Sequence, residues 1–363
     1  MYQEQEHLTF NDTVNLGSFY TPQHIINIVF EMLKKNVKGI EKYFVIDTSC
    51  GYGSFLLPNE LFSNDKIIGA DIDAEALKIA QKNNHEAKYY CLNSLASTKR
   101  TSYGLAKEDK VIVIGNPPYN DKTSIIRNKI KHIDFEIDDT LKARDLGTSF
   151  MLSYQKLKAD YVCVLHPLSY LLKKTNFDNL RSFKHNYILK DAIVLSSREF
   201  LKTSKTTQFP IVIAFYEKND CGMEYNFVCG WNFKTIEGKQ FRINQFDYIG
   251  DYITKYPNKQ SVSPENTVAY FWTMRDINAL KRSKTFINED SVHAIRVTKE
   301  NLIYYQYVDI FKKYIKHIPY YFGNSDVFID NDYFVKNQNI FVNNKQEKLD
   351  IYFRNLLGEH YVD

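Results

Sequence analysis

Residues 111–119 read Val111-Ile112-Val113-Ile114-Gly115-Asn116-Pro117-Pro118-Tyr119, an apolar run followed by a rigid turn. A short apolar run of branched residues is typical of a buried strand in a parallel sheet. Each proline fixes φ at about −65° and removes an N–H donor, and the first biases the residue before it toward an extended conformation. The Asn116 carboxamide and the Pro117 carbonyl are thereby left as acceptors at the carboxyl end of a strand, where open α/β sheets bind ligands. Two such acceptors can direct the lone pair of a facing amino group toward an electrophile. A plain tight turn is the alternative interpretation.

Around this run, apolar strands alternate with helical patterns as far as residue 218, which predicts an α/β fold with a doubly wound, mostly parallel sheet of seven strands. The expected strands are 43–47, 66–71, 88–92, 110–114, 161–166, 188–195 and 209–217. The expected helices are 23–37, 54–61, 74–83, 148–158, 168–173 and 176–185. From Asn219 onward the pattern changes to short Tyr- and Phe-rich segments broken by Asn, Gly and Pro. The sequence therefore predicts a larger α/β domain over 1–218 and a smaller domain over 219–363.

Composition narrows the class of protein. The chain has 363 residues, with 44% hydrophobic and 25% charged residues, as is usual for a soluble globular protein of one large or two ordinary domains. Its five cysteines form no C-x-x-C pair, so neither a zinc site nor a disulfide framework is expected, and reduced thiols favour the cytoplasm. The polar amino terminus lacks the apolar core of a signal peptide, and no apolar run is long enough to span a membrane.

Charge is distributed unevenly along the chain. Lysine and arginine exceed aspartate and glutamate by 6 over residues 120–218, whereas residues 1–119 have a balance of −2 and residues 219–363 are neutral. The positive excess follows directly after the Asn-Pro-Pro-Tyr turn, where it would attract a polyanion such as nucleic acid. A solvated lysine-rich face is the competing interpretation.

A glycine-containing turn follows the first expected strand, in the sequence Asp47-Thr48-Ser49-Cys50-Gly51-Tyr52-Gly53. Gly51 and Gly53 would let the backbone turn sharply and approach a ligand closely. The spacing is neither the dinucleotide fingerprint nor a phosphate-binding loop. About twenty residues later Asp71 ends the second strand, where a carboxylate suits the hydroxyls of a ribose. Asp73, in contrast, is expected to cap the helix that begins at Ala74.

Two further polar positions complete the pattern. The third strand ends at Asn93, whose carboxamide could accept from an adenine amino group, although asparagine is also an ordinary turn residue. Upstream, Thr21-Pro22 precedes an amphipathic helix, which is a good helix start by itself. The functional interpretation folds this segment over the ligand.

Taken together, the motifs resemble the gamma-class S-adenosylmethionine-dependent DNA adenine-N6 methyltransferases of restriction–modification systems. The chain keeps that family's motif order over about residues 15–218. The resemblance implies that 1–218 is the catalytic methyltransferase domain and that 219–363 is the target-recognition domain. The resemblance implies a class I, Rossmann-like methyltransferase fold, S-adenosylmethionine as cofactor and double-stranded DNA as substrate. It also implies a prokaryotic, nucleoid-associated protein and a possible partner restriction endonuclease.

The same resemblance assigns roles to individual residues. It implies cofactor contacts from Tyr20, Thr21, Asp47, Ser49, Gly51, Gly53, Asp71, Ile72, Asn93 and Asn116. It implies a catalytic set of Asn116, Pro117, Pro118, Tyr119 and Phe200. In these roles Tyr20 and Thr21 meet the methionine end of the cofactor, Ile72 packs on its adenine, and Asn93 stands where the family usually has aspartate.

The implied reaction is in-line transfer of a methyl group to N6 of an adenine flipped out of the duplex. Tyr119 would stack on the flipped base, together with an aromatic residue from the loop 196–208. Phe200 is the best match for that second aromatic, and Phe209 is the second choice. A buried loop anchor is the alternative role for Phe200.

Several other functions share part of this pattern. A ribosomal-RNA adenine methyltransferase would be chemically equivalent, whereas protein-glutamine methyltransferases place their helper domain first. A non-catalytic DNA-binding or specificity subunit disagrees with the intact Asn-Pro-Pro-Tyr turn. A fused nuclease has only Glu237-Gly238-Lys239 after Asp220 in its favour. Basic residues that could contact DNA interleave with tyrosines in the carboxyl-terminal part: Arg275, Lys281, Arg282, Lys284, Arg296, Lys312, Lys313 and Lys316, with Tyr304, Tyr305, Tyr307 and Tyr314.

Overall fold

The computed structural model describes residues 21–119, 136–200, 208–259 and 262–363. The chain divides into two compact units. The first unit contains Met1–Thr206 and Ile211–Gln240, and the second contains Thr207–Pro210 and Phe241–Asp363. The first unit therefore continues beyond the predicted boundary at residue 218, because the segment that follows adds strands to its sheet.

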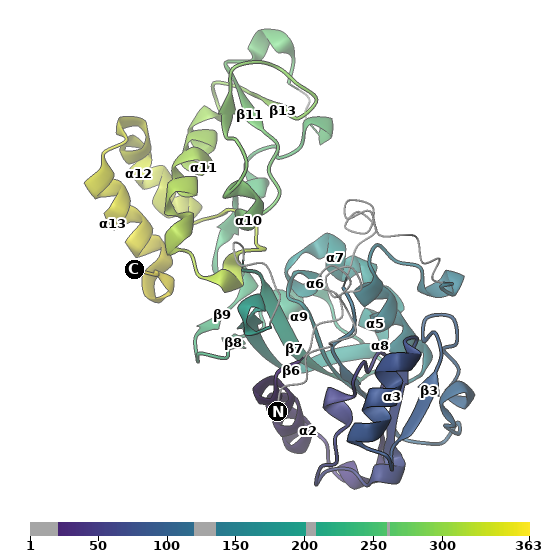
Figure 1. Cartoon of the computed structure of the whole chain (residues 1–363). Coiled ribbons are helices and arrows are strands. Elements are labelled where there is room, and N and C mark those ends of the chain that lie inside the picture. Colours follow the sequence, from purple (N-terminus) through teal and green to yellow (C-terminus); the bar gives the residue numbers. More distant parts are fainter. Residues whose placement is uncertain (1–20, 120–135, 201–207, 260–261) are drawn as a thin grey trace. The chain divides into compact units, whose positions relative to one another are not determined.

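The first unit is built on a nine-stranded sheet with the order β3-β2-β1-β4-β5-β7-β6-β8-β9 (Figure 1). Its strands are β1 (Phe44–Asp47), β2 (Ile67–Asp71), β3 (Lys88–Cys91), β4 (Val111–Gly115), β5 (Tyr161–Pro167), β6 (Tyr187–Ser196), β7 (Pro210–Lys218), β8 (Phe233–Thr235) and β9 (Gln240–Phe241). Strands β1 to β5 pair in parallel, whereas β7 is antiparallel to β5. All seven predicted strands are present, and the predicted sheet of seven is extended by β8 and β9.

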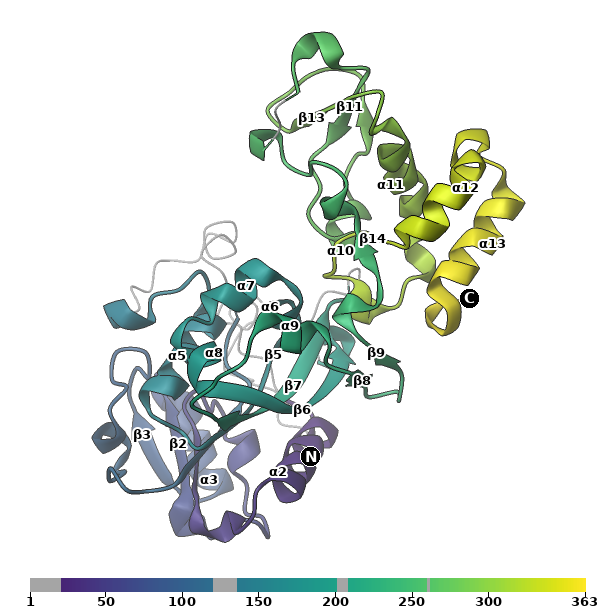
Figure 2. The same ribbon diagram turned by 180° about the vertical axis from the view of Figure 1, so that it is seen from behind.

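Helices lie against both faces of this sheet, as the opposite views of Figures 1 and 2 show. The described helices of this unit are α2 (Gln23–Asn36), α3 (Ala74–Asn83), α5 (Leu146–Lys156), α6 (Ser169–Leu172), α7 (Lys174–Asn179), α8 (Ser182–Asn186) and α9 (Tyr225–Cys229). Helix α2 buries one apolar face, with Ile25, Val29 and Leu33 fully buried. This arrangement is the doubly wound α/β fold that the alternating pattern predicts.

Two predicted helices are wrong. The expected helix 54–61 is only a 3₁₀ turn, Ser54–Leu56, because Leu57 is extended (φ −62°, ψ 150°). Leu57 precedes Pro58, and the proline ring disfavours helical backbone at the residue before it. The expected helix 176–185 is interrupted at Arg181, where φ is +44°, so α7 and α8 are separate.

The segment Glu237-Gly238-Lys239 forms the turn that connects β8 to β9. The Gly238 N–H donates to the Thr235 carbonyl at 2.9 Å, and the Thr235 N–H donates to the Lys239 carbonyl at 2.8 Å. Gly238 has φ +87°, a conformation that glycine adopts without strain. These three residues therefore have a structural role in the turn between β8 and β9.

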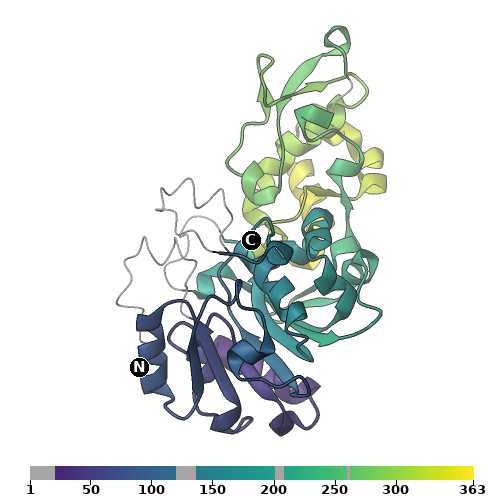
Figure 3. The same ribbon diagram turned by 90° about the vertical axis from the view of Figure 1, so that its right-hand side faces the viewer.

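The second unit combines two small sheets with three longer helices. Its sheets have the orders β12-β11-β13 and β10-β14. Its strands are β10 (Asp247–Tyr248), β11 (Ala269–Trp272), β12 (Phe286–Ile287), β13 (Ala294–Val297) and β14 (Phe328–Ile329). Its helices are α10 (Ile277–Leu280), α11 (Leu302–Tyr314), α12 (Asn331–Asn343) and α13 (Gln346–Leu357), and the last three pack side by side (Figures 2 and 3).

An aromatic core holds the second unit together. The ring of Tyr307 lies within 5.1 to 6.4 Å, between ring centroids, of Phe311, Phe334, Phe341, Tyr352 and Phe353. The Tyr307 hydroxyl donates to the Phe328 carbonyl at 2.8 Å, which satisfies its buried polar atom. Among the described residues of the whole chain, no helix is long and apolar enough to cross a bilayer.

Candidate active site

The carboxyl ends of β1, β2 and β4 lie next to one another, because β1 pairs with both of the other strands. β1 ends at Asp47, β2 ends at Asp71, and β4 ends at Gly115, one residue before Asn116. The parallel register sets these ends at the same side of the sheet, where α/β proteins bind ligands. The fold thus brings together the glycine turn, the acidic strand end and the Asn-Pro-Pro-Tyr turn.

The turn after β1 needs its glycines. Gly51 and Gly53 have φ of +51° and +75°, in the left-handed region that other residues adopt only with strain. The Gly51 N–H donates to Asp71 Oδ2 at 2.8 Å, so the turn is tied directly to the end of β2. A Cβ on Gly53 would lie 3.1 Å from the Ala80 Cβ, which shows how closely α3 approaches the turn.

Asp73 is the helix cap that the sequence predicts, whereas the contact of Asp71 with a ribose remains a prediction. Asp73 Oδ1 accepts the N–H groups of Glu75 and Ala76 at 2.9 and 3.1 Å and so caps α3. Asp71 accepts N–H groups from Gly51 and from Asp73, and it retains further lone pairs for a ligand. Burial raises the pKa of Asp71, although its backbone hydrogen bonds oppose that shift.

Asp47 lies deeper, with only 2% of its surface exposed. Its Oδ1 accepts the Ser49 N–H at 3.0 Å, and the carboxyl group packs against the backbone of Gly115. Burial raises the pKa of Asp47 to about 7; the Ser49 N–H lowers it, and the negative charge of Asp71 raises it further. Two carboxyl groups at adjacent strand ends make this a place where a positive charge is stabilised.

The Asn116 carboxamide is held from two directions. Its Nδ2 donates to Thr21 Oγ1 at 3.2 Å, from a residue that lies before α2 and is 3% exposed. Its Oδ1 is a hydrogen-bond partner of the Tyr119 hydroxyl, which also lies 2.8 Å from the Leu165 carbonyl oxygen at the end of β5. Asn116 and Tyr119 are half-buried. The predicted catalytic asparagine therefore lies beside the predicted Thr21, 95 residues away in the sequence.

The Tyr119 ring packs against the first turn of α5. A Cβ on Gly147 would lie 3.0 Å from Tyr119 Cδ1 and 2.5 Å from the Tyr170 hydroxyl oxygen. Burial raises the pKa of Tyr119 well above its ordinary value, so the hydroxyl stays protonated and can donate. Its predicted stacking on a base remains a prediction.

Asn93 is engaged in local structure. Its Oδ1 accepts the Leu95 N–H at 3.0 Å, and its Nδ2 donates to the Glu136 carbonyl at 2.7 Å. This is the ordinary turn chemistry given above as the alternative, and the proposed contact with adenine remains a prediction. The next residue does connect this strand end to the glycine turn, since the Ser94 hydroxyl donates to the Thr48 carbonyl at 2.6 Å.

The predicted aromatic partner of Tyr119 is Phe200, which is 4% exposed and therefore buried in this structure. Burial matches the alternative role as a loop anchor, and stacking on a base would require Phe200 to move. Phe209, the second choice, is half-buried. Tyr20 and most of the loop 196–208, from residue 201 to residue 207, lie outside the described residues.

Residue patterns alone did not indicate that Gly115 and Gly147 make room for side chains of the site. Gly115 has φ +141°, and a Cβ on it would lie 2.7 Å from Asp47 Oδ1. Gly147 gives the Tyr119 ring its space, as described above. The position of Gly115, directly before Asn116, was the available signal; nothing in the sequence around Gly147 indicates its contact.

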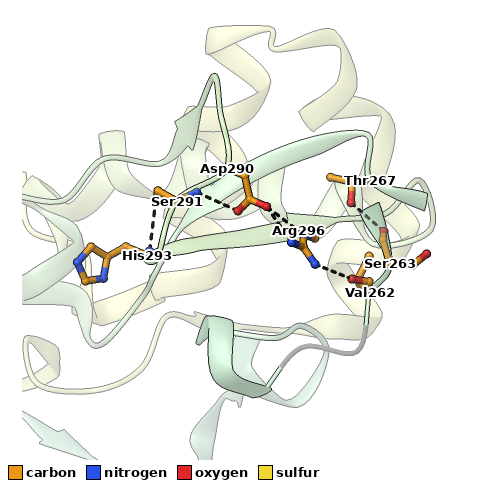
Figure 4. Close-up of polar contacts among 7 residues, drawn as sticks. All are labelled: Val262, Ser263, Thr267, Asp290, Ser291, His293 and Arg296. Carbon is orange, nitrogen blue, oxygen red and sulfur yellow. Dashed lines mark hydrogen bonds and ion pairs between the residues drawn. The ribbon is translucent and has the colours of Figure 1, made fainter. Parts of the chain in front are cut away.

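In the second unit, part of the basic and aromatic set is occupied structurally. The Arg296 guanidinium binds Asp290 Oδ2 at 2.9 Å and the Val262 carbonyl at 3.3 Å (Figure 4). Lys312 Nζ donates to the Ser283 carbonyl at 2.6 Å. Three of the four tyrosines are core residues with at most 3% exposure: Tyr305, Tyr307 and Tyr314. The exposed members of the set are Arg275, Lys281, Arg282, Lys284, Lys313 and Lys316.

The site has the features that S-adenosylmethionine requires. The glycine turn has no Cβ at the two points where the backbone would approach a ligand, and Asp47 and Asp71 favour a cationic group. Ile72 is apolar yet 51% exposed beside Asp71, which suits the face of an adenine ring. Within the described part of the chain, the buried Ser49 Oγ has no hydrogen-bond partner, so a polar ligand atom could satisfy it.

Comparison with solved structures finds similar folds at low identity. The methyltransferase subunit of a type I restriction–modification system from Streptococcus thermophilus is 15% identical, with 62% of this chain and 49% of that chain covered and a TM-score of 0.42. The protein in the DrdV–DNA complex is 16% identical, with 62% of this chain and 28% of that chain covered and a TM-score of 0.38. A SAM-dependent methyltransferase from Anabaena variabilis is 11% identical, with 58% of this chain and 92% of that chain covered and a TM-score of 0.34. Likeness at this level carries no argument about function, and no curated protein matches the sequence.

The family comparison is more informative. The model of the N-6 DNA methylase family matches residues 6–219, which is more than half of the chain and includes every motif named above from Thr21 to Phe200. The doubly wound sheet and the glycine turn agree with the class I methyltransferase fold of that family. The chain therefore belongs to the N-6 DNA methylase family, and its cofactor is S-adenosylmethionine.

Proposed function

We propose that the chain transfers a methyl group from S-adenosylmethionine to N6 of an adenine flipped out of duplex DNA, as the modification enzyme of a restriction–modification system. The observation that carries the proposal is the Asn116-Pro117 turn at the end of β4, adjacent to the end of β1 and its glycine turn. The Asn116-Pro117 turn and the predicted cofactor turn therefore follow two neighbouring strands of the sheet. Family membership supports the same chemistry.

The work of the chain in this reaction is alignment. Asn116 Oδ1 and the Pro117 carbonyl accept the two N6 hydrogens, which directs the nitrogen lone pair toward the electrophile. When bound, the cofactor supplies the electrophilic methyl carbon on a positively charged sulfur. No general base is needed before transfer, because the amine becomes acidic only once the nitrogen is cationic, and the extra proton then passes to water. Holding both reactants in line can supply about 7–11 kcal/mol of the barrier reduction.

Asp47 and Asp71 supply the electrostatic part. Their carboxyl groups end the two strands that flank the glycine turn, and Asp71 is fixed by the Gly51 N–H. A cationic sulfur is therefore attracted to this end of the sheet, whereas the product, which lacks that charge, is attracted less. The difference favours release of the spent cofactor.

The test is to express the protein in a bacterium without DNA methylation and to map modified bases across its genome. N6-methyladenine at one recurring sequence is expected with the wild-type chain and absent with Asn116→Ala. An unmodified genome, or a modified base other than adenine, would refute the proposal. Supplying duplex DNA, ribosomal RNA and a release-factor-like protein with labelled cofactor then separates the three possible substrate classes.

The same variant gives a quantitative check. Asn116→Ala removes a fixed acceptor, and losing one such hydrogen-bonding group at a reaction centre typically costs about 10²–10³ in rate. Cofactor affinity, measured by calorimetry, should change little, because the glycine turn, Asp47 and Asp71 are unaltered. A rate of methyl transfer in Asn116→Ala that stays within about ten-fold of the wild type would reject the acceptor role of Asn116.

A further inference from the structure

The Asn116 carboxamide makes two contacts that come from different parts of the sequence. Thr21 Oγ1 lies 3.2 Å from Nδ2, and the Tyr119 hydroxyl is the partner of Oδ1. The single hydrogen of the Tyr119 hydroxyl is shared between Asn116 Oδ1 and the Leu165 carbonyl oxygen of β5, which lies 2.8 Å from the hydroxyl oxygen. The carboxamide is therefore fixed at both of its ends.

Such fixing matters because the two ends of a carboxamide have nearly the same shape and opposite hydrogen-bonding character. The proposed reaction needs the oxygen, and not the NH₂ group, to face the substrate amine. A carboxamide that rotates presents the wrong end for part of the time, and rotation also moves the oxygen out of line.

Thr21 is well placed to prevent that rotation. It is 3% exposed, so little water can replace its hydroxyl as the partner of Nδ2. Without that hydroxyl, Nδ2 would be an unsatisfied donor at a poorly hydrated position, which costs enough free energy to turn the carboxamide toward another acceptor. The Thr21-Pro22 segment precedes α2, with Pro22 at the N-cap position, and thereby acquires a role at the reaction centre.

We propose that Thr21 is a positioning residue that acts through Asn116, with the Tyr119 hydroxyl as the opposite support. This inference deepens the proposed function and depends on it. It also differs from the role that the family resemblance gives Thr21, which is contact with the methionine end of the cofactor.

The test compares Thr21→Val, which keeps the shape and removes the hydroxyl, with Thr21→Ser, which keeps the hydroxyl. Single-turnover methyl transfer is measured at saturating cofactor on a duplex that contains a site mapped in the genome of the expression host. Thr21→Val should be about 10- to 100-fold slower, the range that one unsatisfied buried donor supports. Thr21→Ser should recover most of the wild-type rate.

Cofactor affinity separates the two roles of Thr21. If Thr21 acts through Asn116, Thr21→Val should bind S-adenosylmethionine within about threefold of the wild type. A larger loss of affinity, an unchanged rate, or a Thr21→Ser protein as slow as Thr21→Val would each overturn the inference. Thr98→Val is the matched control: Thr98 is 4% exposed, and its hydroxyl has no partner in the described part of the chain.

A second measurement needs neither activity nor a Thr21 variant. The side-chain NH₂ signals of Asn116, assigned by their absence in Asn116→Ala, should exchange with solvent more slowly than those of the exposed Asn339. Equal exchange would overturn the inference even if the protein methylates DNA. Conversely, slow exchange in a protein that methylates no DNA would refute the proposed function and leave the contact between Thr21 and Asn116 in place.

Discussion

At the scale of single residues, Asp47 shows how burial and ligand charge are coupled. Its carboxyl group is 2% exposed and lies near Asp71, and these surroundings raise its pKa to about 7. The ionised form is therefore costly until a positive group arrives. S-adenosylmethionine carries such a group, so binding of the cofactor should be linked to loss of a proton from Asp47.

This linkage predicts that affinity for S-adenosylmethionine rises with pH. With a pKa of about 7, Asp47 is mostly protonated at pH 6 and mostly ionised at pH 8, so affinity should rise about ten-fold over that range. Calorimetry at several pH values measures the effect. Asp47→Asn is the control, because it cannot ionise while the cofactor's own amino group titrates equally in both proteins. Identical pH profiles for the two proteins would contradict the role of Asp47.

Gly115 leads to a prediction from geometry alone. In Gly115→Ala, the new Cβ would meet Asp47 Oδ1 at 2.7 Å on a backbone with φ +141°, which side chains rarely tolerate. We expect a loss of about 1–3 kcal/mol in the free energy of unfolding, together with impaired methyl transfer. Gly230→Ala is the matched control, since its nearest contact would be 3.6 Å and its φ is −83°. Chemical denaturation measures the free energy of unfolding of both variants. An equal loss in the two would show that the backbone and packing at Gly115 impose no special requirement for glycine.

The identity of a residue predicted its local structural role better than it predicted which distant residues it contacts. Asp73 could be assigned as a helix cap because capping depends on residues two and three positions away. The contact of Gly115 with Asp47 and that of Thr21 with Asn116 join residues distant in sequence, so no local pattern could reveal them. For Asn93 the sequence left two roles open, because a polar residue at the end of a strand is equally typical of a ligand contact and of a turn.

At the scale of elements, long and buried strands could be predicted from the sequence, whereas short ones could not. Strands β1, β2, β4 and β5 are mostly apolar, and their bounds lie within a residue or two of those predicted. Strands β8 and β9 have three and two residues, too few for any periodic pattern. The predicted helix 54–61 is wrong because the prediction followed the apolar spacing of this segment and gave too little weight to Pro58, which disfavours helical backbone at the preceding residue.

Helix α3 provides a prediction that separates stability from binding. Asp73→Ala removes two cap hydrogen bonds and should lower the free energy of unfolding by about 1 kcal/mol, with cofactor affinity nearly unchanged. Asp71→Ala should instead remove most of the cofactor affinity, because Asp71 fixes the glycine turn and is the expected ribose ligand. Denaturation and calorimetry on the two variants test this division. Equal losses of cofactor affinity would show that the assignment of Asp71 is wrong.

At the scale of the whole molecule, net charge says little, since the chain carries only +4 at pH 7. The second unit nevertheless exposes Lys281, Arg282 and Lys284 together, directly after α10. Lys284 Nζ lies 5.9 Å from the centroid of the Trp272 ring, which could also meet a base. We propose this cluster as a contact for the DNA backbone.

Reversing these three charges to glutamate should weaken binding to duplex DNA by at least about ten-fold. Each lost phosphate contact should also reduce the slope of log affinity against log salt concentration by about 0.9. Reversing Lys336, Lys345 and Lys348, which are exposed on or beside α12 and α13, is a control with the same change in net charge. If both triple variants lose the same affinity and slope, the cluster has no specific role.

The extension of the first sheet also determines how the catalytic part of the chain should be isolated. A fragment that stops at residue 218 would lack β8, leaving the hydrogen-bonding groups of Ile193 and Val194 in β6 without their neighbour. An uncovered edge of that kind is a template for strand addition by other molecules and hence for aggregation. Truncation after Phe241 retains both β8 and β9, so the longer fragment should stay monomeric where the shorter one precipitates.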